Sequence, residues 1–282
     1  PVKIFNRENV NKYSFNINDE KFLNDISEKN TDNKFFITTA TTWNYDKTKP
    51  AYDFLTDKIG VILPYEQLKG YSYGKYYNDE DKTLEKFALD FLKRADFNIS
   101  GYKVSEEKIT SEKLKVIPDT FKEFIPSNTL FYNVNTKHIM NNEIYELDIN
   151  EESVGTRAVF SLIPVLKDVL DNRKVLIIDE LDKSLHPFIV QYIVEIFNSK
   201  EVNKLGAQLI FNTHDTNLLD LDLLRRDQIW FTEKNPNDGI STIYPLDDFS
   251  VRKTENVEKG YLLGRYGAIP FITNDFNDFM GE

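Results

Sequence analysis

The stretch Val175-Leu176-Ile177-Ile178-Asp179-Glu180 decides the fold class. A short, uninterrupted apolar run suits a strand that is buried on both faces of a parallel sheet. Two carboxylates follow this run directly, and ligands of such sheets bind at the carboxyl ends of the strands. The stretch therefore predicts an α/β protein that handles a metal and an attacking water at this edge of its sheet.

From residue 150 onward, helix and strand patterns alternate, as they do in α/β domains. Residues 156–170 carry a wide apolar stripe at helical spacing, and a later helix is expected to begin at Pro187, because proline is favoured at a first helical position. A second buried strand at residues 208–211 leads into Asn212-Thr213-His214-Asp215. We therefore expect polar clusters at two adjacent strand ends. Two further strands are predicted at residues 228–232 and 241–246.

The first half of the chain is less regular. The patterns predict extended pieces within residues 3–15, a strand at 35–39, a helix within 50–63, an amphipathic helix at 79–95, and hairpin strands at 130–136 and 143–149 joined through Met140-Asn141-Asn142. Residues 100–126 are charged and weakly patterned, which indicates an inserted or peripheral segment. The fold as a whole is predicted to be a sheet with flanking helices and a helical and β-hairpin inserted region.

Composition narrows the class of protein. The 282 residues are 40% hydrophobic, contain no cysteine and carry a formal net charge of −11. These values predict a core of substantial size, agree with a reducing cytoplasm, and disfavour broad electrostatic binding to nucleic acid. No stretch is long enough to span a membrane, and no signal-peptide pattern is present. The chain opens on Pro1 without an initiator methionine, so we expect either a processed product or a fragment.

The polar clusters can be given chemical roles. Asp179 is suited to hold Mg²⁺ through water, Glu180 to orient or deprotonate the attacking water, and His214 to contact the terminal phosphate. Ser153, Gly155 and Thr156 lie at a predicted helix start, whose free amides suit a phosphate. Structural interpretations stand beside these roles: Ser153 and His186 as helix caps, His138 as uninvolved, and the pair Arg225-Arg226 as a solvated face.

Several motifs resemble those of ABC-type ATPases. Ser153-Val154-Gly155-Thr156 is similar to the signature motif, the 175–180 stretch to the Walker B strand, Lys183-Ser184-Leu185-His186-Pro187 to the D-loop, and His214 to the switch histidine. More narrowly, residues 179–187, 212–220 and 262–270 resemble the AAA-15/AbiLi-like ATP-binding proteins, relatives of the OLD family found in phage defence. The resemblance covers residues 150–272 and, more weakly, residues 36–62.

This resemblance implies a P-loop NTPase fold and an ATP-hydrolysing head of an abortive-infection-like protein, with ATP and Mg²⁺ as cofactors. It further implies a homodimer that sandwiches ATP and an effector partner such as a nuclease or toxin. The implied domains are the remainder of an N-terminal ATPase lobe at 1–78, a helical insertion at 79–127 and a C-terminal lobe at 128–282. The implied roles are catalysis by Glu180 and His214, metal binding by Asp179, and nucleotide binding by Ser153, Gly155, Thr156, Ser184 and His186.

One departure from the pattern concerns the phosphate loop. No G-x-x-x-x-G-K-[ST] occurs in the 282 residues, and Gly70 and Gly74 before Lys75 have neither the spacing nor the hydroxyl. We therefore expect this chain alone to bind ATP weakly, with the loop lost or cut away. Two alternatives stay open: a DNA-repair or chromosome-maintenance ATPase, and a degenerate scaffold that binds an effector without hydrolysis. The terminal Gly264-Arg265-Tyr266-Gly267 string is expected to form a tight turn packed on the core.

Overall fold

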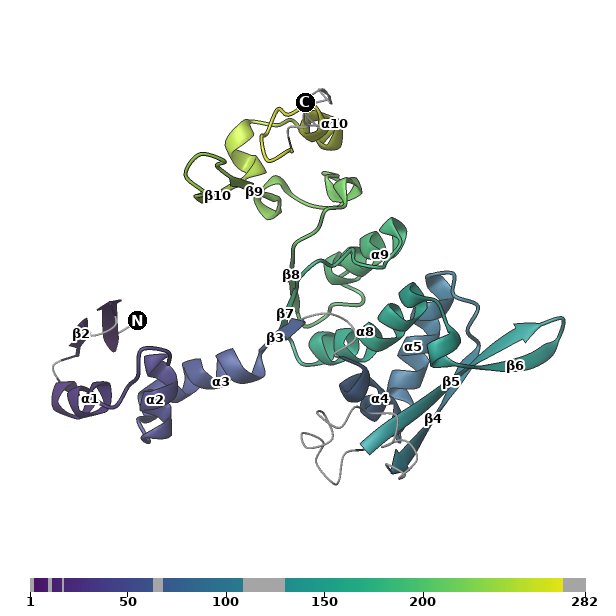
Figure 1. Ribbon diagram of the computed structural model, residues 1–282, viewed down its shortest axis with the longest axis horizontal. Helices are drawn as coiled ribbons and strands as arrows, with labels where there is room; N and C mark the ends of the chain where they lie inside the picture. The colour runs from purple at the N-terminus through teal and green to yellow at the C-terminus, as the bar shows by residue number, and fades with distance from the viewer. Residues whose placement is uncertain (1–2, 10–11, 17, 63–67, 109–129, 271–282) are drawn as a thin grey trace, which may run out of the picture. The chain divides into compact units, whose positions relative to one another are not determined.

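A computed structural model describes residues 3–9, 12–16, 18–62, 68–108 and 130–270 (Figure 1). The chain forms two compact units. Unit 1 comprises Pro1–Asp179 and Lys200–Phe211, and unit 2 comprises Glu180–Ser199 and Asn212–Glu282. Within the described ranges, no helix combines the length and the apolar character that crossing a membrane requires.

Unit 1 contains the predicted parallel sheet. Its strands are β3 (Ile59–Ile62), β7 (Val175–Ile178) and β8 (Gln208–Phe211), in the order β3-β7-β8 with both pairs parallel. The helix predicted within residues 50–63 ends at Asp57, and residues 59–62 form β3 instead, because they pair with β7. The central strand β7 buries Leu176 and Ile178, as its apolar run predicts. The strand predicted at residues 208–211 is confirmed. The prediction that it is buried is wrong, since Ile210 is 53% exposed. Among the described strands β8 is at the edge of its sheet, where one flank is uncovered.

Three helices of unit 1 pack together beside an antiparallel sheet. The helix α8 (Val154–Asp171) contacts α4 (Lys69–Tyr77) and α5 (Thr83–Arg94). Phe160 of α8 is fully buried, and its ring stacks on Tyr76 at 4.4 Å and meets Tyr102 edge-on at 5.4 Å. The helices predicted at 79–95 and 156–170 are confirmed, with bounds shifted by a few residues.

The antiparallel sheet of unit 1 has the order β4-β5-β6: β4 (Gly101–Lys108), β5 (Leu130–Met140) and β6 (Glu143–Asp148). Asn141 and Asn142 connect β5 to β6 with φ angles of 54° and 65°, the left-handed pair that a tight two-residue hairpin turn needs. The predicted hairpin is confirmed. In the weakly patterned stretch 100–126, residues 101–108 form β4, and residues 109–126 lie outside the described ranges.

The first residues of unit 1 form a small cluster of their own. Strands β1 (Phe5–Asn9) and β2 (Lys12–Phe15) pair, as the extended pattern predicts, and precede α1 (Glu20–Ser27), α2 (Phe36–Thr42) and α3 (Lys49–Asp57). The predicted strand at 35–39 is wrong, because these residues begin α2. Phe36 and Ala40 are four residues apart on one helical face and pack with Leu23, Ile26 and Tyr45, so this shared core overrides the β preference of the Thr-rich run.

Unit 2 contains α9 (Pro187–Asn198), the hairpin β9 (Trp230–Lys234) and β10 (Ser241–Pro245), and α10 (Val257–Leu262). The helix start at Pro187 is confirmed, and β9 begins two residues later than predicted because Arg226–Gln228 form a 3-10 turn. Tyr266 is buried and stacks on Phe231 at 5.7 Å, while Gly264 and Gly267 have φ angles of 77° and 69°. The terminal string is therefore the tight, core-packed turn that was expected.

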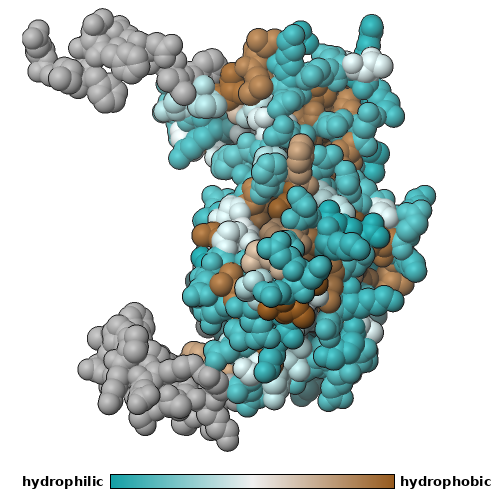
Figure 2. Space-filling view, turned by 90° about the vertical axis from the view of Figure 1, so that its right-hand side faces the viewer, coloured by the Kyte–Doolittle hydropathy of each residue, from teal (hydrophilic) through white to brown (hydrophobic). Residues whose placement is uncertain are grey.

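Polar side chains cover most of the face that Figure 2 shows, with apolar ones scattered among them. The apolar residues of α5 that recur at helical spacing, Leu84, Ala88 and Phe91, are buried.

Candidate functional site

Two polar segments leave the parallel sheet at the same edge. Ile178 of β7 pairs in register with Phe211 of β8, so Asp179 and Asn212 are the next residues on adjacent parallel strands. The prediction of polar clusters at two adjacent strand ends is confirmed. Asp179 has an exposed side chain directly after the buried part of β7, which is the usual location of ligand-binding residues in such sheets.

Within unit 2, three hydrogen bonds join the two segments to each other. The Glu180 N–H donates to Asn212 Oδ1 at 2.5 Å, and the Leu181 N–H donates to the Asn212 carbonyl at 3.1 Å. In the other direction, Asp182 Oδ1 accepts from the His214 N–H at 3.3 Å. Each segment therefore supplies a side chain that holds the backbone of the other, and Glu180 and His214 are brought into one cluster, here called the strand-end cluster (residues 180–183 and 212–215).

Glu180 adopts an unusual backbone conformation. Its φ of 53° is left-handed, which costs a non-glycine residue about 1–2 kcal/mol. Lys183 Nζ lies 3.1 Å from Glu180 Oε2, but both side chains are about half exposed, so this ion pair contributes little and is easily displaced. The conformation is held by Asn212, and the carboxylate is accessible from solvent.

The predicted D-loop is a second left-handed turn. Ser184 has a φ of 64° and is exposed, and Leu185 behind it is buried. His186 caps α9, because its Nδ1 accepts from the Phe188 N–H at 3.3 Å while Pro187 occupies the first helical position. The capping interpretation of His186 is confirmed. Nucleotide binding by Ser184 and His186 stays a prediction.

The signature-like segment belongs to unit 1. Ser153 is the N-cap of α8: its Oγ accepts from the Thr156 N–H at 3.0 Å and lies 2.7 Å from Thr156 Oγ1. Thr156 is 7% exposed, whereas Ser153 and Val154 face solvent. Capping by Ser153 is confirmed, and the exposed start of an 18-residue helix carries the partial positive charge that favours an anion.

Sequence patterns missed some residues that shape these segments. Sequence patterns assign no role of their own to Asn212 and Asp182, although these residues hold the strand-end cluster together. His138 was interpreted as uninvolved, yet its Nε2 lies 2.8 Å from Oε1 of Glu152, the residue before Ser153. Polar residues directly after two predicted strands are the available signal for Asn212 and Asp182, whereas nothing in the sequence links residue 138 to residue 152.

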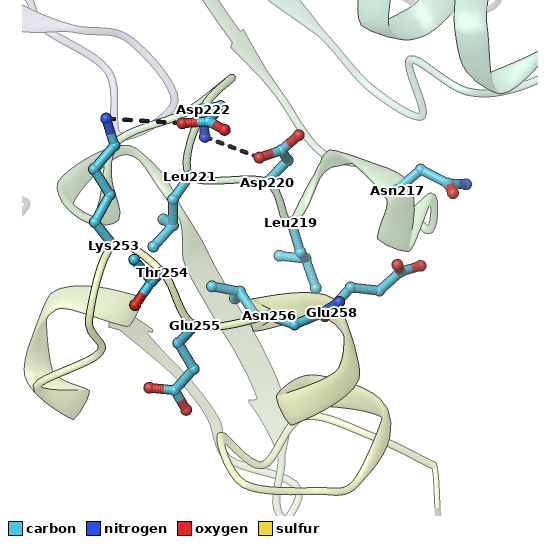
Figure 3. Close-up of a pocket in the computed structure, with 11 residues that line it drawn as sticks. Asn217, Leu219, Asp220, Leu221, Asp222, Lys253, Thr254, Glu255, Asn256 and Glu258 are labelled. Atoms are coloured by element: carbon cyan, nitrogen blue, oxygen red, sulfur yellow. Dashed lines mark hydrogen bonds and ion pairs between the residues drawn. The ribbon is translucent and has the colours of Figure 1, made fainter.

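A separate cavity of about 400 Å³ lies within unit 2 (Figure 3). It is lined by residues 217, 219–222 and 253–258. Lys253 Nζ lies 3.7 Å from Asp222 Oδ1, and the Asp222 N–H donates to Asp220 Oδ1. None of the predicted site residues lines it. In the described part of the chain, no group of three or more His, Asp or Glu is arranged to hold a metal ion, here or in the strand-end cluster.

Comparison with known families identifies the family of the chain. A family model described as "AAA domain, putative AbiEii toxin, Type IV TA system" matches residues 6–220, a range that includes the parallel sheet, the signature-like segment and the strand-end cluster. Among curated proteins, no relative matches the chain. The mixed α/β content, the parallel sheet and the flanking helices are those of a P-loop ATPase-like fold. The chain belongs to this family of AAA ATPase domains, which is associated with toxin–antitoxin and abortive-infection systems.

Proposed function

We propose that the chain is the ATP-hydrolysing head of an ABC-type, abortive-infection protein of phage defence, similar to the AbiLi-like relatives of the OLD family, acting in the cytoplasm. The observation that carries this proposal is the strand-end cluster. There, Asn212 holds Glu180 and Asp182 holds His214 directly after two adjacent parallel strands. A carboxylate and a histidine fixed at the ligand-binding edge of a sheet suit hydrolysis of a phosphoanhydride.

Each residue of this edge has a role in the proposal. Glu180 accepts a proton from the attacking water, since its carboxylate is exposed and fixed at its backbone. His214 contacts the γ-phosphate. Asp179 holds Mg²⁺, and a single exposed carboxylate fits this ion, which takes its remaining ligands from phosphate oxygens and water rather than from a protein cage. The bound ion would neutralise charge that develops on the phosphates.

A homodimer completes the proposed site. Ser153, Gly155 and Thr156 at the start of α8 would act on a nucleotide held by the other subunit, because ABC-type heads use the signature motif in trans. Ser184 and His186 would lie near the same nucleotide. An effector protein, such as a nuclease or toxin, would couple the hydrolysis cycle to defence, whereas the net charge of −11 gives no support to nucleic acid as the main partner.

The absence of a phosphate-loop motif from the 282 residues limits the ATP affinity expected of this chain. The 282 residues contain no G-x-x-x-x-G-K-[ST], the loop whose lysine and amides grip the β- and γ-phosphates. We expect the purified 282-residue chain to bind ATP weakly. Micromolar affinity measured by calorimetry would contradict this part of the proposal.

The decisive test compares variants of the product of the complete reading frame that encodes these residues. Glu180→Gln should lower ATP turnover by about 10²–10⁴-fold, because the general base is lost, and should accumulate an ATP-bound dimer. The matched control is Glu20→Gln, which makes the same change at an exposed position of α1 and should leave turnover intact. ATP turnover is measured for both variants, and light scattering measures the amount of dimer. Equal turnover in Glu180→Gln and the wild type would remove Glu180 from its assigned role.

A further inference from the structure

A buried carboxylate lies immediately before the signature-like segment. The Glu152 side chain is 9% exposed, and its Oε1 accepts two hydrogen bonds from β5: one from His138 Nε2 at 2.8 Å and one from Thr136 Oγ1 at 2.6 Å. His138 is itself only 17% exposed, and Thr136 is fully buried. Burying a carboxylate is costly unless donors of this kind compensate it, so these two contacts decide where Glu152 can lie.

The backbone of the same residue is held from the other side. Arg157 Nη1 donates to the Glu152 carbonyl at 2.6 Å and to the Asn150 carbonyl at 3.0 Å. Glu152 is thus fixed through its side chain to β5 and through its carbonyl to α8. Ser153 follows directly and caps α8, so the position of the cap depends on that of Glu152.

We propose that His138 is a positioning residue for the signature-like segment, residues 153–156, and acts on it through Glu152. This inference rests on the proposed function, because it assigns the segment a role in ATP hydrolysis. Stability alone does not explain the pair, since apolar side chains of similar volume usually stabilise a core as well as a buried polar pair does. His138 touches no proposed reacting group, so its effect is exerted through the carboxylate.

The expected consequence is a selective loss of turnover. Without the His138 donor, the Glu152 carboxylate has one compensating side chain fewer and moves toward solvent, which displaces Ser153 and the first amides of α8. A displacement of this kind can cost on the order of 10- to 100-fold in kcat. The KM for ATP should change little, because P-loop ATPases grip the phosphates chiefly with a phosphate loop and not with a segment of this kind.

Two variants at one position separate positioning from simple packing. His138→Phe keeps a ring and removes the donor, whereas His138→Gln supplies an amide N–H at similar reach and should restore most of the kcat. Lys137→Gln is the control, since Lys137 is on the opposite face of β5 and pairs with Glu146. In a Glu152→Gln background, His138→Phe should lower kcat less than in the wild type, because the charged group that it positions is already gone.

Turnover is measured on the product of the complete reading frame. Amide hydrogen exchange is measured by NMR on the purified 282-residue chain at Thr156 and Arg157, whose N–H groups donate to Ser153. Faster exchange in His138→Phe, with rescue in His138→Gln and no change in Lys137→Gln, supports the proposal. Wild-type kcat in His138→Phe would overturn it, as would equal losses in both His138 variants that follow a loss of thermal stability. If the wild type itself hydrolyses no ATP, the proposed function fails, and the exchange data alone decide whether His138 orders the segment.

Discussion

Replacing Tyr76 by phenylalanine removes one buried hydroxyl that stands in for a missing helical hydrogen bond. Pro164 lies inside α8 and has no N–H to donate to the Phe160 carbonyl four residues earlier. The Tyr76 hydroxyl of α4 donates to that carbonyl instead, at 3.0 Å. Burial raises the pKa of Tyr76 well above its ordinary value, so the hydroxyl stays a donor at any practical assay pH.

The cost of the substitution follows from this geometry. Phe160 is fully buried and Tyr76 nearly so, which means that no water can replace the lost donor without repacking. A buried carbonyl left without a partner costs about 1–3 kcal/mol. For a unit of this size each kcal/mol corresponds to about 2–4 °C in Tm. The ring itself is kept, so its stacking on Phe160 should be preserved.

A double-mutant cycle isolates the compensation. Pro164→Ala supplies the N–H that Phe160 lacks, so Tyr76→Phe should cost at least about 1 kcal/mol less in the Pro164→Ala background than in the wild type. Urea and thermal denaturation of the purified chain, followed by circular dichroism, measure the four stabilities. An equal cost of Tyr76→Phe in both backgrounds would refute the claim that this hydroxyl compensates for the proline. No cost in either background would refute the hydrogen bond itself.

Two other predictions concern the strand-end cluster and the first residues of the chain. Asn212→Ala should lower ATP turnover of the complete product by about 10-fold, because the Glu180 N–H loses its acceptor. Asn212→Asp keeps an acceptor oxygen and is the matched control. Equal turnover in the wild type and both variants would contradict a role of Asn212 in holding Glu180. Burial, followed by the hydrogen bond to Asp19, raises the pKa of Tyr45 to about 12. The pKa of tyrosine in the unfolded chain is about 10, so the stabilising effect of the raised pKa should be complete below pH ~10 and be lost between pH ~10 and ~12. Tyr45→Phe should remove this part of the pH dependence of the unfolding free energy, measured by denaturation. An unchanged pH dependence would show that Tyr45 is not its source.

The parallel sheet could be predicted because its signal is local. Apolar runs bounded by polar residues, at 175–178 and 209–211, identify β7 and β8 without knowledge of their neighbours. The strand β3 is not identified in this way, because residues 59–62 continue a helical spacing. The burial of β7 and β8 could not be predicted from these runs, because Leu176 of the central strand and Ile210 of the edge strand look alike in sequence. Strand order is a property of the whole sheet, and a run of apolar residues does not report it.

The strand predicted at 35–39 failed for a related reason. Its phenylalanine, isoleucine and threonine residues have β preferences, which are weak and depend on context. Phe36 and Ala40 instead meet the side chains of α1 in one core. Contacts between side chains ten or more residues apart in the sequence determine the conformation. Propensities within the segment do not report such contacts.

In the strand-end cluster, sequence patterns predict the functional residue types but not the contacts that hold them. The carboxylate of Glu180 and the ring of His214 could be proposed from residue type and order alone, because chemistry restricts which side chains can do such work. What holds them could not, since Asn212 acts on the backbone N–H of Glu180 across 32 positions of sequence. The left-handed φ of Glu180 is equally invisible in a sequence that has no glycine at that position. A non-glycine residue persists in such a conformation only where its surroundings impose it, and the Asn212 side chain supplies part of that constraint. Glu180 is thus both the residue with the strained backbone and the proposed general base. This coincidence is expected where a conformation is kept for function rather than for stability.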